Sequence, residues 1–319
     1  MLTWFTENPL FRMARQAVRL PHIVLVIVLG FAIAFLSQFG AIPVFVAQIM
    51  LYGFSEGGIN GPENVSAALS GLWMAAQLIA SFGGIFLFLW LWTKFFEKRR
   101  FASLGLEKAN ALFRYLRGLG IGVAMFSGAV GLLAVFGFVR IETGQPAMQG
   151  LPALGGVLIV LIGWLVQGAG EELLTRGWML PVLSVRYKPW LGIVVSSLFF
   201  AILHGLNPNL SLIALVNLTL FGLFAAFYAL REGSLWGVCA LHSAWNWVQG
   251  NIFGLEVSGS SAGGGTLFNL LETGPDWFTG GPFGPEGGLA VSALLLFGMA
   301  IIFLWPAPPQ ETGPEFGEA

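Results

Sequence analysis

The feature that most constrains this chain is a cluster of charged residues placed directly after a long uncharged segment. Residues 151–170 contain no charged side chain, and a run of about 20 apolar residues is long enough to cross a bilayer as a helix. Glu171, Glu172 and Arg176 follow, and apolar sequence then resumes. Each charge at the centre of such a helix costs roughly 2.5–3.5 kcal/mol. These charges therefore require partners, and ionisable groups inside membrane helices indicate a functional site.

The composition of the whole chain indicates an all-α polytopic membrane protein. Of its 319 residues, 56% are hydrophobic and 10% are charged, whereas soluble domains carry about a quarter charged residues. The net charge of −1 gives no basic excess, so we expect no nucleic-acid partner. The expected location is the plasma or inner membrane of a cell, as a multi-pass protein whose constant partner is the lipid bilayer.

The apolar runs predict about eight transmembrane helices in a single domain, residues 23–305. An amphipathic N-terminal segment, residues 1–22, is expected on the membrane surface, and residues 306–319 form an acidic, Pro-rich tail. The predicted spans are approximately 23–50, 67–93, 118–139, 151–184, 190–206, 210–230, 234–253 and 288–305. Residues 94–117 are interpreted as a basic loop.

The distribution of basic residues predicts the orientation of these spans. Thirteen of the 15 lysines and arginines fall in segments on one side, Arg140 falls on the other, and Arg176 lies within a span. Basic residues accumulate in cytoplasmic loops, so both termini are expected in the cytoplasm. The Gly-rich loop 254–287 is then outside, where we expect it to be mobile or to form a lid.

Residues capable of chemistry gather in three short motifs on separate spans. Glu172 and Arg176 are four residues apart with the acid first, the favoured order for an ion pair on one helix face. With a rise of about 1.5 Å per residue, the charged and imidazole groups reach comparable depths. The motif residues are Glu171, Glu172 and Arg176 in the fourth span, Phe200 and His204 in the fifth, and His242 and Asn246 in the seventh.

These groups fit two chemistries and a structural alternative. A carboxylate and an imidazole holding one water form a general base, and imidazole and amide N–H groups can donate to an oxyanion. Together they predict hydrolysis of an amide bond by activated water. Alternatively, Glu171, His204 and His242 could bind zinc, although the sequence has no His-Glu-x-x-His motif. The structural alternative is a buried ion pair with hydrogen bonds between helices.

The three motifs resemble those of the CPBP family, the CAAX-protease and bacteriocin-processing (ABI) intramembrane proteases. That family has Glu-Glu-x-x-x-Arg, Phe-x-x-x-His and His-x-x-x-Asn in this order, and the resemblance covers about residues 165–250. It implies an eight-helix intramembrane endopeptidase whose active site opens towards the cytoplasm. Its substrate would be a membrane-associated or lipid-modified peptide or protein.

The resemblance also implies a role for each motif residue. Glu171 would activate water with His204, His242 and Asn246 would donate to the oxyanion, and Glu172 and Arg176 would orient the site. We expect no cofactor, with zinc as the alternative. Two other functions stay open, namely a catalytically silent scaffold or immunity protein of the same family, and a transporter, because charges in the middle of the membrane also mark ion paths.

Overall fold

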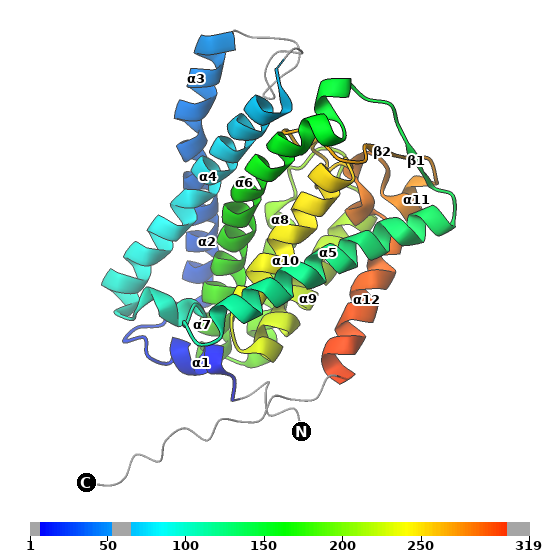
Figure 1. Cartoon of the computed structure of the whole chain (residues 1–319). Coiled ribbons are helices and arrows are strands. Elements are labelled where there is room, and N and C mark those ends of the chain that lie inside the picture. The colour runs from blue at the N-terminus through cyan, green and yellow to red at the C-terminus, as the bar shows by residue number, and fades with distance from the viewer. Residues whose placement is uncertain (1–6, 53–64, 305–319) are drawn as a thin grey trace, which may run out of the picture.

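The protein is a bundle of helices with a small two-stranded ribbon at one end (Figure 1). The structure, a computed structural model, describes residues 7–52 and 65–304. The helices are α1 Pro9–Ala14, α2 Ile23–Gln38, α3 Ile42–Tyr52, α4 Ala67–Trp92, α5 Ala111–Val135, α6 Leu154–Glu172, α7 Leu180–Arg186, α8 Pro189–Leu203, α9 Leu212–Glu232, α10 Trp236–Trp247, α11 Asp276–Thr279 and α12 Leu289–Leu304. The strands are β1 Val139–Ile141 and β2 Leu270–Glu272, and π-helical turns occupy Thr93–Glu97, Leu173–Met179 and Val248–Ile252.

Five helical segments of the described chain are long and apolar enough to cross a membrane. They are Ile23–Leu51, Ala67–Glu97, Ala111–Val135, Leu151–Arg186 and Leu212–Glu232. The shorter apolar helices α8 and α12 correspond to the predicted fifth and eighth spans, and α10 with its π turn corresponds to the seventh. The chain is therefore a multi-pass membrane protein, with its predicted spans recovered as helices of unequal length.

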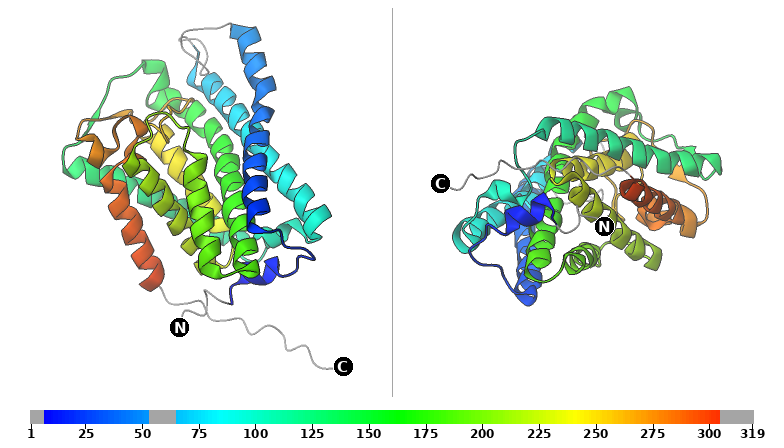
Figure 2. Two further views of the ribbon diagram at one scale, coloured as in Figure 1. Left: turned by 180° about the vertical axis from the view of Figure 1, so that it is seen from behind. Right: turned by 90° about the horizontal axis from the view of Figure 1, so that it is seen from below.

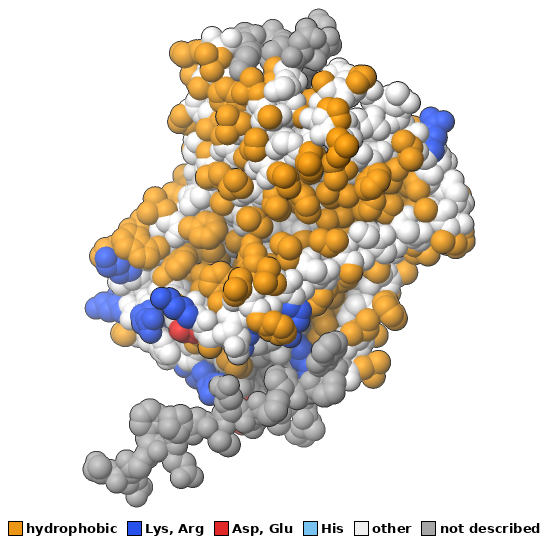
Figure 3. Space-filling model, viewed as in Figure 1, with side chains coloured by type: hydrophobic (Ala, Val, Ile, Leu, Met, Phe, Trp, Pro, Cys, Tyr) orange, Lys and Arg blue, Asp and Glu red, His pale blue; other side chains and the backbone are white. Residues whose placement is uncertain are grey.

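The two ends of the bundle differ in charge. The α1 end carries α1, α7 and the end of α12, and the α11 end carries the β1–β2 ribbon and α11 (Figures 1 and 2). Lysine and arginine side chains on the visible face gather at the α1 end, apart from one group near β1 (Figure 3). Hydrophobic side chains cover the surface between the ends, as expected of a surface that faces lipid.

Glycines allow the central helices to approach closely. α5 crosses α10 obliquely (Figure 1), and a Cβ on Gly118 would collide with the carbonyl oxygen of Gly237. Gly122 lies in the same way against the Leu241 backbone. The Gly-x-x-x-Gly spacing in α5 therefore serves close packing against the helix that carries His242 and Asn246.

The predicted basic loop 94–117 is shorter in the structure, because α5 begins at Ala111. The extra helical turns contain Arg114 and Arg117, whose long side chains can keep their charge at the membrane edge while their stems cover apolar surface. Arg117 also forms an ion pair of 2.5 Å with Glu232 at the end of α9. Hydropathy alone places the start of this helix too late, because its first turns carry charged residues.

The described part of the N-terminal segment packs into the protein. Leu10 and Phe11 of α1 are only 1% exposed, and the Asn8 side chain donates to the Leu230 carbonyl oxygen at 2.6 Å. The remaining residues of this segment, 1–6, and the predicted acidic tail 306–319 lie outside the described residues. Helix α1 thus covers the end of the bundle at which it lies.

The segment 254–287, expected to be mobile or a lid, has a defined fold in the structure. Its strand β2 pairs antiparallel with β1, with Val139 opposite Glu272, a ribbon that hydropathy did not predict. Asn251 donates to the carbonyl oxygens of Gly263 and Gly265 at 2.8 and 3.0 Å. The segment is therefore held against the ends of α6 and α10 on the α11 side.

We expect Gly118→Ala to destabilise the protein, because its methyl group would push α5 away from the Gly237 backbone. Overpacking of a close contact typically costs about 1–3 kcal/mol. The matched control is Gly120→Ala on the same helix, since nothing lies within 4 Å of its added Cβ. Thermal unfolding in detergent should show a lower midpoint for Gly118→Ala alone, and equal midpoints would contradict this packing.

We also expect stability to fall as pH rises, because of Glu272 in the β1–β2 ribbon. Burial, followed by the nearby Glu256 and Asp276, raises the pKa of Glu272 from 4.5 to about 8. The folded state therefore favours the protonated form, and its stabilising effect is present below pH 4.5 and lost towards pH 8. Melting midpoints measured across this range should fall less in Glu272→Gln than in the wild type, whereas Glu107→Gln, an exposed control, should behave as wild type.

Candidate active site

The two adjacent glutamates lie where α6 changes into a π-helical turn. α6 ends at Glu172, and the wider turn Leu173–Met179 follows. Neighbouring residues of a helix are rotated by about 100°, so the two carboxylates enter different surroundings. The side chain of Glu171 is 11% exposed and lines a cavity, whereas that of Glu172 is fully buried. Such π turns occur frequently at functional sites.

Glu172 forms a buried polar cluster with Arg176 and His242. Its Oε1 lies 3.1 Å from Arg176 Nη1 and 2.8 Å from His242 Nδ1, so the predicted ion pair between Glu172 and Arg176 is present. Arg176 also donates to the Gly222 carbonyl oxygen of α9 at 3.1 Å, and its guanidinium lies 4.7 Å from the Phe200 ring centroid. The cluster therefore joins α6, α8, α9 and α10.

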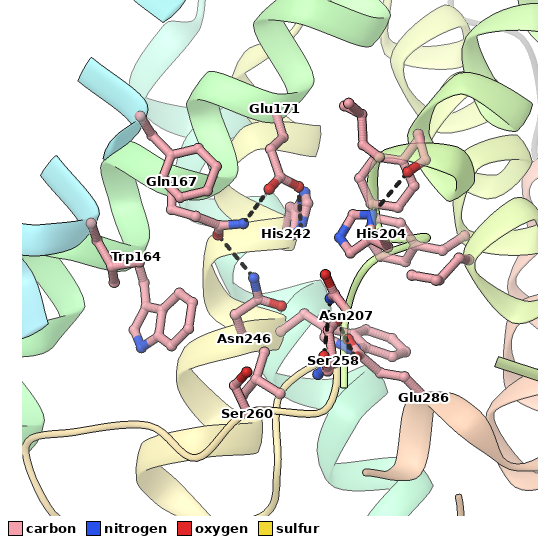
Figure 4. Close-up of a pocket in the computed structure, with 18 of the residues that line it drawn as sticks. Trp164, Gln167, Glu171, His204, Asn207, His242, Asn246, Ser258, Ser260 and Glu286 are labelled. Carbon is pink, nitrogen blue, oxygen red and sulfur yellow. Dashed lines mark hydrogen bonds and ion pairs between the residues drawn. The ribbon is translucent and has the colours of Figure 1, made fainter. Parts of the chain in front are cut away.

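Glu171 is held by an amide that our sequence analysis did not single out. Gln167 Nε2 donates to Glu171 Oε1 at 2.8 Å, and Gln167 Oε1 accepts from Asn246 Nδ2 at 2.9 Å (Figure 4). One N–H of the Asn246 amide remains for another acceptor. The sequence does contain a feature that could have indicated Gln167. It is the one carboxamide residue of the uncharged run 151–170, and it lies four residues before Glu171.

The second oxygen of Glu171 faces His242 without a direct hydrogen bond. Glu171 Oε2 lies 3.7 Å from His242 Nε2, and it has no hydrogen-bond partner within the described chain. A polar contact of this length leaves space for a bridging water. His242 Nδ1 lies against the Glu172 carboxylate, which can only accept, so Nδ1 carries a proton and donates it there. The other ring nitrogen, Nε2, faces Glu171.

His204 stands on the other side of the same cavity, at the end of α8 (Figure 4). Its Nδ1 lies 2.8 Å from the Phe200 carbonyl oxygen. Because a carbonyl oxygen only accepts, Nδ1 carries the proton and Nε2 of the neutral ring has its lone pair free. The Phe-x-x-x-His spacing thus fixes both the ring orientation and the tautomer of His204.

The cavity has a volume of about 390 Å³. Trp164, Gln167 and Glu171 line it from α6, and His242 and Asn246 from α10. Opposite them lie residues that the motifs did not indicate, contributed by the loops of the α11 end: Asn207, Ser258, Ser260 and Glu286 (Figure 4). Glu286 accepts from Ser258 N at 2.9 Å, from Ser258 Oγ at 2.7 Å and from Trp245 Nε1 at 3.2 Å. No sequence pattern marks it beyond its charge next to the last span.

Charge balance within the site leaves one proton to be placed. Two glutamates and Arg176 sum to one negative charge, and an imidazolium at His242 would make the group neutral. Glu171 Oε2 lies 3.7 Å from His242 Nε2, and a water bridging this distance could carry a proton between the two groups. A carboxylate that exchanges a proton with a neighbouring imidazole has the properties required of a general base.

The histidines and carboxylates of the site are also residue types that bind metal ions. Among the described residues, no three His, Cys, Asp or Glu side chains are grouped so that they could hold a metal ion. Glu171, His204 and His242 line one cavity (Figure 4). Nδ1 of each histidine is engaged by a carbonyl or carboxylate oxygen, so Nε2 is the nitrogen that each ring can offer to the cavity.

We expect Glu172→Ala to destabilise the protein strongly, because it leaves Arg176 buried without its counter-ion. Removing one partner of a buried ion pair typically costs about 3–5 kcal/mol. Glu171→Gln is the matched control, because the introduced carboxamide can still accept from Gln167 and leaves the buried cluster intact. Unfolding in detergent should show a much lower midpoint for Glu172→Ala alone. A wild-type midpoint with Arg176 still buried would contradict the ion-pair interpretation.

Comparison with known protein families gives the same identification as the motifs. Residues 153–248 match the family described as type II CAAX prenyl endopeptidase Rce1-like. The matched region contains all the motif residues, from Glu171 to Asn246. Searches among curated proteins and among solved structures found no match. The region 153–248 therefore belongs to the Rce1-like type II CAAX prenyl endopeptidase family, within CPBP (ABI), and this implies a peptidase.

Proposed function

We propose that the protein is an intramembrane endopeptidase that hydrolyses a peptide bond of a membrane-associated or lipid-modified peptide or protein. The observation that carries this proposal is the state of Glu171 at the cavity wall. One of its oxygens is fixed by Gln167, and the other has no hydrogen-bond partner in the described part of the chain and faces His242 at 3.7 Å. A fixed carboxylate with one free oxygen next to a cavity is suited to hold and deprotonate a water molecule.

In the proposed reaction, water enters between Glu171 Oε2 and the two imidazoles. Glu171 accepts a proton from the water as its oxygen attacks the carbonyl carbon of the substrate. Nε2 of His204 has a free lone pair because its Nδ1 proton is bound to the Phe200 carbonyl oxygen, so it can accept the second hydrogen of the water and orient it. The proton taken by Glu171 then passes to the leaving amine as the C–N bond breaks.

The oxyanion is proposed to form near His242 and Asn246. Nε2 of His242 can donate when it carries a proton, while Nδ1 stays bound to the Glu172 carboxylate. Asn246 donates through the N–H that Gln167 does not use. Glu172 and Arg176 do not line the cavity and therefore act by orienting His242, and Gln167 positions both Glu171 and Asn246.

The orientation of the protein belongs to the same proposal. We place α1 and the end of α12 on the cytoplasmic side, because thirteen basic residues lie in the segments on that side and only Arg140 lies in the opposite loops. The family match supports a protein or peptide as the substrate.

We expect Glu171→Gln to abolish cleavage without unfolding the protein, because a carboxamide keeps the shape but cannot take a proton. General-base catalysis contributes about 10²–10⁴-fold, and loss of His242 or Asn246 should each lower the rate by roughly 10²–10³-fold. The measurement is membrane proteomics of cells carrying Glu171→Gln, in which the uncleaved substrate should accumulate and be cut by purified wild-type protein.

Glu286→Gln is the control, since it changes a carboxylate on the opposite wall of the same cavity. It should retain most activity. A Glu171→Gln variant that still cleaves would contradict the proposed base. A second outcome would also contradict it: the purified protein contains stoichiometric zinc, a chelator removes both zinc and activity, and added zinc restores activity. The reaction would then depend on zinc and not on water activation by Glu171 alone. Absence of any accumulated protein would favour the silent scaffold.

A further inference from the structure

The candidate site is closed on the side of the α1 end. Between the cavity and that end lie Glu172 and Arg176, both with fully buried side chains. Further towards the α1 end the layer is continuous, since the following residues are 0–1% exposed: Leu10, Phe11, Leu180, Val182, Leu183, Leu235, Val238 and Leu241. No described residue of α7 lines the cavity. Water and substrate therefore cannot reach Glu171 through this layer as it stands.

The cavity extends instead towards the α11 end. α2, α8, α9, α10 and α12 line it from their halves nearer that end, together with the loops there. α6 lines it from its other half, which carries Trp164, Gln167 and Glu171. Among the lining residues, Gln38 at the end of α2 and Ser260 in the loop after α10 are exposed. In Figure 4, Ser258, Ser260 and Glu286 lie on the side of the cavity away from Glu171.

Two expectations from the sequence therefore exclude one another. Both termini were expected in the cytoplasm, and the resemblance implied a site that opens towards the cytoplasm. The structure places the opening and the basic α1 end on opposite sides of the bundle. If the site opened to the cytoplasm, thirteen basic residues would lie outside and Arg140 alone inside, the reverse of the charge rule for membrane proteins.

We infer that the site admits water and substrate from the extracytoplasmic side of the membrane. On the proposed peptidase function, the substrate is then a membrane-anchored segment whose cleaved bond lies at the outer leaflet. The lining of the cavity is mostly apolar, including Phe35, Leu78 and Phe82, and no lysine or arginine is among the described residues that line it. With Glu171 and Glu286 in the lining, an apolar segment without acidic side chains fits best.

The accessibility of single cysteines tests this inference without requiring proteolysis. Met74→Cys places a thiol in the cavity wall, and Lys108→Cys places one on the exposed surface of the α1 end. The probe is a membrane-impermeant, cationic methanethiosulfonate, applied to right-side-out and to inside-out membrane vesicles. The parent protein is the blank, because its one cysteine, Cys239, is buried.

We expect Met74→Cys to be labelled in right-side-out vesicles and this labelling to be lost in inside-out vesicles, with the reverse pattern for Lys108→Cys. Ser260→Cys, on the loop of the α11 end, should follow Met74→Cys and serves if that variant fails to fold. Labelling of Met74→Cys or Ser260→Cys from the inside-out vesicles would overturn the inference, as would a cavity cysteine that reacts from neither side.

The same labelling in a Glu171→Gln background separates this inference from the proposed function. The expected pattern should persist there, because access to the cavity does not depend on catalysis. If the pattern holds and no substrate accumulates in Glu171→Gln cells, the peptidase proposal fails while the extracytoplasmic opening stands. If substrate accumulates but the cavity is labelled from the cytoplasmic side, the opening is wrong and the peptidase proposal stands.

Discussion

The buried Glu172 carboxylate is the interaction on which the geometry of the site depends. It lies in an apolar bundle where a charge without partners would be very costly, and it meets Arg176 and His242 at hydrogen-bond distance. Because Arg176 also contacts Gly222 of α9 and the face of Phe200 in α8, satisfying one charge fixes the relative positions of four helices. The imidazole of His242 is thereby oriented before any substrate binds, which is the form of preorganisation that catalysis requires.

Two identical side chains next to one another in sequence have different environments. Each has one oxygen without a hydrogen-bond partner among the described residues, but that of Glu172 is enclosed by the protein, whereas Glu171 lines the cavity. The difference arises because successive helical residues are rotated by about 100°. Gln167, one turn earlier, binds the other oxygen of Glu171. An acid that serves the structure therefore lies beside one available for proton transfer.

The bundle is also asymmetric along its length. At the α1 end, helix α1 and the buried residues of α7 close the structure. At the α11 end, the segment 254–287 folds over the helix ends and is anchored by Asn251, Asn217 and Glu286. Asn217, for example, donates to the carbonyl oxygens of Glu286 and Gly288 at 2.7 and 2.8 Å. The cavity lies between these unlike ends, so access to it is determined by how the segment 254–287 covers it.

The sequence alone determined the class of the protein, its helices and the motif residues, because hydropathy and local spacing are properties of neighbouring residues. It predicted the Glu172–Arg176 pair from an interval of four residues, and the structure confirms that pair. It did not predict the bond from His242 to Glu172, the link through Gln167 to Asn246, or the Glu286 contacts. Each of these joins segments that are far apart in the chain. The direction in which the cavity extends was likewise decided only by tertiary packing. It depends on which buried side chains meet across the helices that line the cavity, and no local pattern in the sequence contains that information.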